Sequence, residues 1–186
     1  MDSVSHVIVV RDLSVSPWPE KRCVLTIGAY DGVHRGHQAV IAAVREQAKS
    51  LNALSVVVTF DKHPASVVRP ESAPLLLTDL EQKIELLSTT GVDAVVVVPF
   101  NEEQSTEEPQ AFVKRVLVDC LHVQHIVVGE DFHFGKNRSG NVALLRTEGA
   151  QHDFTTGPLD LLAREDGVEE PISSTAIRRA LRGGEI

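Results

Sequence analysis

The stretch CVLTIGAYDGVHRGHQ, residues 23–38, passes from a short apolar run through a glycine-containing segment into a helical pattern. The run CVLTIG has the length and apolar content of a buried strand, and the residues that follow His37 repeat with the period of an amphipathic helix. Gly28, Gly32 and Gly36 leave the connecting backbone uncrowded, so a phosphate group could approach its amide groups and the amino end of the helix. The stretch therefore predicts a strand, a phosphate-binding loop and a helix, in that order.

The same alternation continues along most of the chain. Short β-branched apolar runs predict strands at residues 7–10, 23–28, 54–60, 93–100 and 125–129. Helical periodicity predicts helices at 38–51, 79–90 and 109–121, and weaker patterns predict a helix at 141–150, a strand around 152–163 and a final helix at 174–182. Apolar strands that alternate with helices are typical of a parallel sheet covered on both faces. We therefore predict an α/β fold, with a Rossmann-like parallel sheet flanked by helices.

Two histidines stand three residues apart at the start of the first predicted helix. At this spacing the rings of His34 and His37 can face one region of space. Imidazoles in that position can donate hydrogen bonds to phosphate oxygens as negative charge develops there. Capping or surface histidines are one alternative, and a zinc site is another, although no nearby Cys or Glu offers an obvious third ligand. The coincidence of strand, glycines and helix favours phosphate binding.

The composition limits the partners and the compartment. The 186 residues include 18 basic and 26 acidic side chains, which gives a net charge of −8. Such a molecule repels polyanions, so we expect neither nucleic acid nor an anionic membrane as a partner. Cys23 and Cys120 lie far apart in apolar segments and are predicted to be buried thiols. With no signal peptide and no apolar run long enough to span a bilayer, we expect a cytoplasmic protein.

Four motifs, in the right order, resemble those of the bacterial FAD synthetases. GAYDGVHRGHQ (28–38) is similar to the GxFDGxHxGH signature of that family, which belongs to the HxGH nucleotidyltransferase superfamily. The others are TFDKHP (59–64), VGEDFHFGKNRSGN (128–141) and ISSTAIRRAL (172–181). The resemblance implies an FMN adenylyltransferase, which transfers AMP from ATP to FMN by direct in-line attack and releases FAD and pyrophosphate.

The sequence departs from the family pattern at three places. Tyr30 stands where the family usually has Phe, and Lys62 replaces the usual Pro. Proteins of the family commonly continue into a riboflavin kinase domain, and no sequence for one follows Ile186. We therefore expect a single FMN adenylyltransferase domain over residues 1–186, and a riboflavin kinase domain missing from this chain is a candidate partner.

The resemblance also implies a set of site residues. Those implied to be catalytic, by neutralising charge on the reacting phosphates, are His34, His37 and Arg178. Those implied to bind ATP are Gly28, Asp31, Gly36, Gly129, Asp131, Ser174 and Thr175, and those implied to bind FMN are Phe60, Lys62, His63 and Pro64. Judged without the family, Ser174 and Thr175 could equally cap a basic helix. Mg²⁺ is expected to bridge the phosphates of ATP, and no protein ligand for it is predicted.

Two other functions remain open at this point. Another HxGH nucleotidyltransferase, acting on phosphopantetheine, nicotinamide mononucleotide or a phosphorylated alcohol, would share the first motif, but the TFDKHP and GEDFHFG stretches argue against it. A flavin- or nucleotide-binding module without catalysis is the second alternative. The intact His34, His37 and Arg178 favour retained chemistry. A phosphate nucleophile is already anionic near neutral pH, so no side chain is required to deprotonate it.

Overall fold

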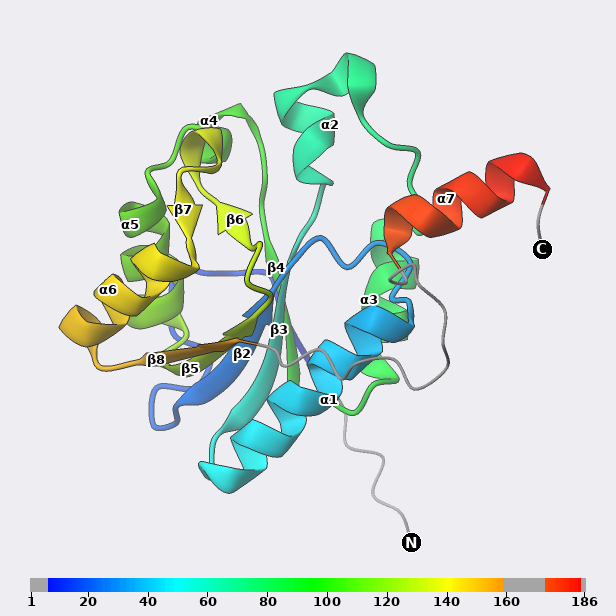
Figure 1. The fold of residues 1–186 in the computed structure, drawn as a ribbon. Helices are drawn as coiled ribbons and strands as arrows, with labels where there is room; N and C mark the ends of the chain where they lie inside the picture. Colours follow the sequence, from blue (N-terminus) through cyan, green and yellow to red (C-terminus); the bar gives the residue numbers. More distant parts are fainter. Residues whose placement is uncertain (1–6, 159–172, 185–186) are drawn as a thin grey trace, which may run out of the picture.

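Six parallel strands form one sheet in the computed structural model, which describes residues 7–158 and 173–184. The sheet order is β1-β4-β3-β2-β5-β8 (Figure 1). The strands are β1 (Ile8–Val10), β2 (Cys23–Ile27), β3 (Leu54–Phe60), β4 (Ala94–Val98), β5 (Val123–Val128) and β8 (Thr155–Pro158). A separate antiparallel pair is formed by β6 (His133–Phe134) and β7 (Gly140–Asn141). The predicted fold class, a Rossmann-like parallel sheet flanked by helices, is confirmed.

Helices cover both faces of this sheet. They are α1 (Arg35–Ser50), α2 (Pro64–Val68), η1 (Pro70–Ser72), α3 (Leu80–Ser88), α4 (Glu102–Ser105), α5 (Pro109–Phe112), η2 (Val113–Cys120), η3 (Lys136–Arg138), α6 (Val142–His152) and α7 (Ser174–Gly183). Helices α1 and α3 pack on one face, and α5, η2 and α6 pack on the other (Figure 1). In the two described ranges, no helix is both long and apolar enough to cross a membrane.

The central strands are buried on both sides, which explains their uninterrupted apolar sequence. Leu25 of β2 packs with the residues of η2, whereas the preceding residue, Val24, packs with those of α1. Successive side chains of a strand point to opposite faces, so every position of β2 meets a helix layer. The two cysteines lie within this core as free thiols, as predicted.

The order in which successive strands are added to the sheet reverses at β2. After β2 the chain runs through α1 to β3 on one side, whereas β5 pairs with β2 on the other side and leads to β8. The connections that leave the carboxyl ends of β2 and β5 therefore separate, and open α/β sheets bind ligands at such a switch point. Residues 28–34 follow β2 and residues 129–132 follow β5, so two of the four motifs meet at this edge.

The structure differs from the predicted elements in several details. The first helix begins at Arg35 and not at residue 38, because His34 is its N-cap. The helix predicted at 109–121 is divided into α5 and a π-helical segment, η2. The short α2, α4, β6 and β7 were not predicted, since elements of this length carry no clear periodicity. The strand predicted around 152–163 is observed as Thr155–Pro158, and residues 159–163 lie outside the described part.

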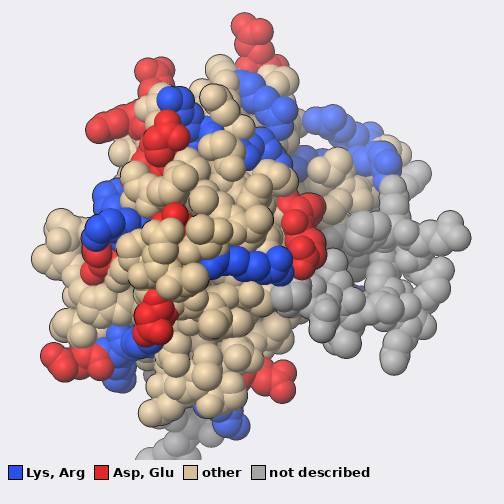
Figure 2. All heavy atoms as spheres, turned by 60° about the vertical axis from the view of Figure 1, so that its left-hand side comes forward, with Lys and Arg blue, Asp and Glu red and all other residues tan. Residues whose placement is uncertain are grey.

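Charges of both signs are interspersed on the side of the molecule that carries α5 and α6. Figure 2 shows acidic side chains next to many of the basic ones on this side. Exposed ion pairs of this region join Lys136 to Glu108 at 3.1 Å and Lys114 to Asp119 at 2.8 Å. Exposed pairs of this kind add little stability, at most about 1 kcal/mol each. They do leave this side without one dominant sign of charge.

Candidate active site

The loop after β2 follows a constrained path. Tyr30, Gly32 and Val33 all have positive φ angles, of 51°, 82° and 38°. Two of these are not glycine, and such backbone strain is typical of functional loops. The Tyr30 hydroxyl forms a 2.8 Å hydrogen bond with the Thr26 hydroxyl. A Cβ atom on Gly28 would lie 3.0 Å from the Tyr30 ring, so any other residue here would require that ring to shift by a few tenths of an ångström.

The two histidines of the loop stack against each other. Their ring centroids are 3.6 Å apart, with 22° between the ring planes. His34 caps α1, and its Nδ1 accepts a hydrogen bond from the His37 amide at 3.4 Å. This bond leaves the proton of a neutral His34 ring on Nε2, where it can be donated to a ligand. His37 Nδ1 is buried and has no hydrogen-bond partner among the described residues.

Both rings are neutral at pH 7. Burial, together with a smaller effect of the neighbouring His34, lowers the pKa of His37 to about 3, although Asp31 opposes the shift. Burial also lowers the pKa of His34, again against the effect of Asp31. A neutral imidazole donates one hydrogen bond and accepts one. Among the described residues no group of three His, Cys, Asp or Glu is arranged to hold a metal ion, so the zinc alternative gains no support from them.

The lowered pKa of His37 predicts that stability falls in mild acid. In the unfolded chain His37 has the ordinary histidine pKa of 6.5 and is protonated below that pH, whereas in the folded protein it is protonated only near pH 3. Stability due to His37 is therefore present above pH 6.5 and is lost as the pH falls below it. From pH 7 to pH 5 the expected loss is about 2 kcal/mol.

Urea unfolding of the wild type and of His37→Gln at both pH values measures this effect. The wild type should lose more stability than the variant, by about 2 kcal/mol. The pKa values of His63 and His125 are also lowered by burial, and their contribution cancels in the comparison, whereas the measured difference includes the coupling of His34 to His37. Equal pH dependence in the two proteins would contradict the buried neutral state of His37.

Asp31 joins the loop to two distant segments. Its carboxylate accepts hydrogen bonds from the Leu77 and Thr78 amides at 3.0 Å. It also forms an ion pair with Arg178 of α7. Burial alone would raise the pKa of Asp31, but these hydrogen bonds together hold it below its usual value. Arg178 in addition donates from Nε to the Leu75 carbonyl at 2.7 Å.

The predicted phosphate-binding residues of α7 lie beside the same loop. Ser173 caps the helix by accepting from the Ala176 amide at 3.1 Å, which leaves Ser174 for another contact. The Ser174 hydroxyl donates to the Asp31 carbonyl at 2.9 Å, and Thr175 is exposed. The structure thus brings Ser174, Arg178 and the histidine loop together around Asp31, although they are far apart in the sequence.

The TFDKHP motif, residues 59–64, lies beside the histidine loop. Phe60 ends β3, Lys62 is exposed, and Pro64 is the first residue of α2. His63 caps α2, with its Nδ1 accepting from the Ala65 amide at 3.2 Å. Burial lowers the pKa of His63, and Arg178 lowers it further. Strand β3 pairs with β2, and the Thr59 hydroxyl donates to the Ala29 carbonyl at 3.1 Å, so the motif leaves the sheet beside the histidine loop.

The predicted adenosine contacts lie after β5, next to β2. Gly129 is followed by a turn in which the Phe132 amide donates to the Gly129 carbonyl at 3.0 Å. A Cβ atom on Gly129 would lie 3.1 Å from an Asp131 carboxylate oxygen. Asp131 is exposed, whereas Phe134 is buried in the core against Phe112. Gly36 lies in the first turn of α1.

Two residues that the sequence analysis did not assign to the site contribute to it. Thr78 donates from its hydroxyl to Asp31 at 3.2 Å and accepts there from the Gly32 amide, also at 3.2 Å. Lys83, on α3, is buried and donates to the carbonyls of Ala29 and Phe60. Lys83 occupies the second position, i+3, of the i, i+3, i+4, i+7 face of α3 that begins at Leu80. A lysine on an apolar face was the available signal.

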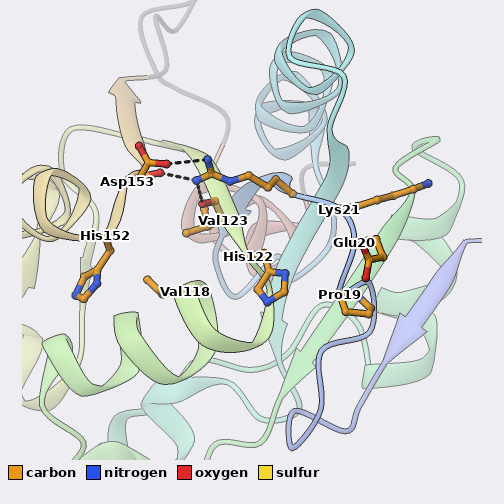
Figure 3. A pocket seen from close by; sticks show the side chains of 9 residues that line it. Pro19, Glu20, Lys21, Val118, His122, Val123, His152 and Asp153 are labelled. Carbon is orange, nitrogen blue, oxygen red and sulfur yellow. Dashed lines mark hydrogen bonds and ion pairs between the residues drawn. The ribbon is translucent and has the colours of Figure 1, made fainter.

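A hollow of about 440 Å³ lies at the opposite, amino-terminal edge of the sheet (Figure 3). Its Arg22 already donates to an Asp153 carboxylate oxygen at 3.1 Å and to the Val123 carbonyl at 2.8 Å. Its His152 lies 3.5 Å from the Glu148 carboxylate. Arg22 and His152 are engaged by acceptors within the protein, and none of the four motifs contributes a described residue to the lining of this hollow.

Comparisons with known proteins agree with this geometry. The sequence model of the family described as FAD synthetase matches residues 16–176. The bifunctional riboflavin kinase/FMN adenylyltransferase of Pseudomonas fluorescens is 43% identical over 164 residues, which are 88% of this chain and 51% of the relative. The protein of the same name from Escherichia coli K12 is 38% identical over 168 residues, 90% of this chain and 53% of the relative. The chain thus spans about half the length of these curated relatives.

A solved structure shares the fold. The crystal structure of a macrolide-efflux protein from Streptococcus pneumoniae matches with a TM-score of 0.78 and 22% identity, over 97% of this chain and 58% of that one. At this identity the likeness shows the fold alone. The parallel sheet with stacked histidines at its carboxyl edge defines an α/β fold of the nucleotidyltransferase type. The chain belongs to the FAD synthetase family.

Proposed function

We propose that this chain is an FMN adenylyltransferase, which transfers AMP from ATP to FMN and releases pyrophosphate. The observation that carries the proposal is the group around Asp31. The stacked His34 and His37 are electrostatically coupled to this carboxylate, and Arg178 is ion-paired with it. Donors on both sides of one loop can then contact the same triphosphate. The name of the curated relatives supports FMN as the acceptor.

The chemistry follows from charge and position. An FMN phosphate oxygen attacks the α-phosphorus of ATP, a new P–O bond forms, and the bond to the pyrophosphate oxygen breaks. The attacking oxygen is already anionic, so catalysis consists of alignment and charge neutralisation. We assign hydrogen-bond donation to the transferred phosphate to His34 and His37, and charge neutralisation on the triphosphate to Arg178. Ser174 and Thr175, at the start of α7, are proposed to bind phosphate oxygens together with free amides of the helix.

The remaining predicted residues complete the two halves of the site. We propose that Gly28, Asp31 and Gly36 shape the ATP side of the histidine loop, and that Gly129 and Asp131 contact adenosine at the switch point. The FMN side is assigned to Phe60, Lys62, His63 and Pro64. His63 fits this role because its capping bond leaves Nε2 free of the cap and able to donate to a ligand.

Mg²⁺ is proposed to enter with ATP and to offset the charge of the leaving pyrophosphate. This ion usually keeps several waters and binds through substrate phosphates and one or two carboxylates. In this mode the ion would be held mainly by the phosphates that His34, His37 and Arg178 are proposed to contact, so no protein cage is required. The Asp31 carboxylate is engaged by four protein donors, so its proposed role is to position the loop and Arg178.

We propose one adenylyltransferase domain over residues 1–186. The match to the FAD synthetase family accounts for residues 16–176, and we assign no riboflavin kinase activity to them. A riboflavin kinase domain remains a proposed partner. The buried thiols of Cys23 and Cys120 suit a reducing compartment, in line with a cytoplasmic protein.

A substrate panel tests the proposed function. Purified protein is incubated with Mg²⁺ and ATP plus FMN, riboflavin, nicotinamide mononucleotide or phosphopantetheine, and the products are separated by chromatography. FAD should form from FMN, and no phosphorylated flavin should form from riboflavin. Adenylylation of another acceptor in preference to FMN would replace FMN as the substrate, and FMN binding without FAD would support a binding module.

A further inference from the structure

A lysine is buried where α3 packs against the sheet. Lys83 is only 7% exposed and shares the buried face of α3 with Ile84 and Leu87. An ammonium group is costly to bury unless its protons reach acceptors. A methionine or leucine would fill the same space without that cost, so packing alone does not account for a lysine here.

The Lys83 ammonium joins the ends of two neighbouring strands. It donates to the Phe60 carbonyl at 2.7 Å and to the Ala29 carbonyl at 3.2 Å. Phe60 is the last residue of β3, and Ala29 lies just beyond the end of β2. The Thr59 hydroxyl donates to the same Ala29 oxygen at 3.1 Å. The bonds therefore connect the backbone at the points where the histidine loop and the TFDKHP connection leave the sheet.

The charges around Lys83 belong to the site described above. Burial lowers the pKa of Lys83, and Asp31 and Asp61 oppose this shift. Lys83 is also among the cations that lower the pKa of His63. The acceptors that the described residues give its ammonium are both backbone carbonyls. Its charge therefore remains close to groups on both sides of the site without a carboxylate bound to it.

We infer that Lys83 is a positioning residue for adenylyl transfer, because its two hydrogen bonds fix the histidine loop relative to the connection that carries His63. This inference rests on the proposed function. In-line attack requires the two substrates to be aligned to within a fraction of an ångström, and a small displacement of one loop is enough to slow it. Lys83 acts through the backbone of Ala29 and Phe60, and no contact with substrate is assigned to it.

Kinetics of Lys83→Met test the inference. Methionine fills similar space and removes both hydrogen bonds. We expect kcat to fall and KM for FMN to rise, each on the order of tenfold, with KM for ATP changed less than about twofold. Lys83→Arg, which keeps the charge and the donors, should recover part of kcat. Leu87→Ala is the matched control, since it is fully buried on the same helix and contacts neither carbonyl through a hydrogen bond.

Assays are run below the melting temperature of every variant, and each is compared with the wild type. If Lys83→Met does not fold, Lys83→Gln keeps one donor group and replaces it in the series. An active wild type with unchanged kcat and KM for FMN in the folded variant would overturn the role of Lys83 alone. An equal loss of kcat in Leu87→Ala would also overturn it, because the loss would then reflect lower stability of the fold and not the hydrogen bonds of Lys83. A wild type that forms no FAD would overturn the proposed function itself.

Discussion

Replacing His37 by alanine is expected to lower kcat for FAD formation on the order of 10²–10³-fold, the cost of removing one donor from a preorganised phosphate site. The ring is held on both sides, by His34 at 3.6 Å and by Tyr30 at 4.8 Å between centroids, so its direction is fixed before substrate binds. Its neutral state leaves one ring N–H that can be donated to a phosphate oxygen. Chromatographic measurement of FAD under saturating ATP and FMN gives the rate.

A histidine at the opposite edge of the sheet provides the control for this substitution. His152 is partly buried beside Glu148, and His152→Ala should retain activity within about twofold. Circular dichroism and the melting temperature show whether each variant keeps the fold. Removal of the partly buried His37 ring leaves a cavity and costs some stability, so the rate is compared well below both melting temperatures. Near-normal FAD formation by a folded His37→Ala protein would contradict its assigned catalytic role.

Local patterns were sufficient to predict the strand, loop and helix at residues 23–50. The run Cys23–Ile27 is apolar at every position because helices cover both faces, and this is visible in the sequence. The distribution of apolar residues in α1 likewise reflects one buried face, formed by Ile41, Val44 and Ala48. Such features depend on neighbours a few residues apart, which is why composition and period reveal them.

Long-range pairing was beyond those patterns. Asp31 and Arg178 are 147 positions apart, and nothing local in either segment indicates that they form an ion pair. The sequence assigned Asp31 to ATP and Arg178 to the triphosphate, whereas the structure shows the two side chains bound to each other. Lys83 stands out in the sequence only as a lysine on an apolar helix face, and its two carbonyl partners are decided when α3 packs on the sheet. Which polar group meets which is decided by tertiary packing, after the elements have formed.

Replacing Arg178 by alanine is expected to lower kcat/KM for ATP on the order of 10²-fold, the second-largest effect predicted here. The guanidinium is bound to Asp31 and to the Leu75 carbonyl, and it is directed toward the histidine loop by both. Its loss removes a cation from the proposed triphosphate site and also leaves the buried Asp31 carboxylate without its ion-pair partner. KM for FMN should change less than about threefold, because the TFDKHP connection keeps its own hydrogen bonds.

Arg182 supplies the control, since it is an exposed arginine in the last turn of the same helix. Arg182→Ala lowers the net positive charge of α7 by the same amount, and it should leave kcat/KM for ATP within about threefold of the wild type at moderate salt. Steady-state kinetics in both substrates separate the two effects of Arg178. Equal rises in KM for ATP and in KM for FMN in Arg178→Ala would mean that α7 no longer docks on the Asp31 loop, and the specific role in triphosphate binding would be wrong. If KM rises for ATP alone, and Arg178→Lys gives an intermediate value, the site requires a cation at this position. This outcome distinguishes charge neutralisation from helix docking.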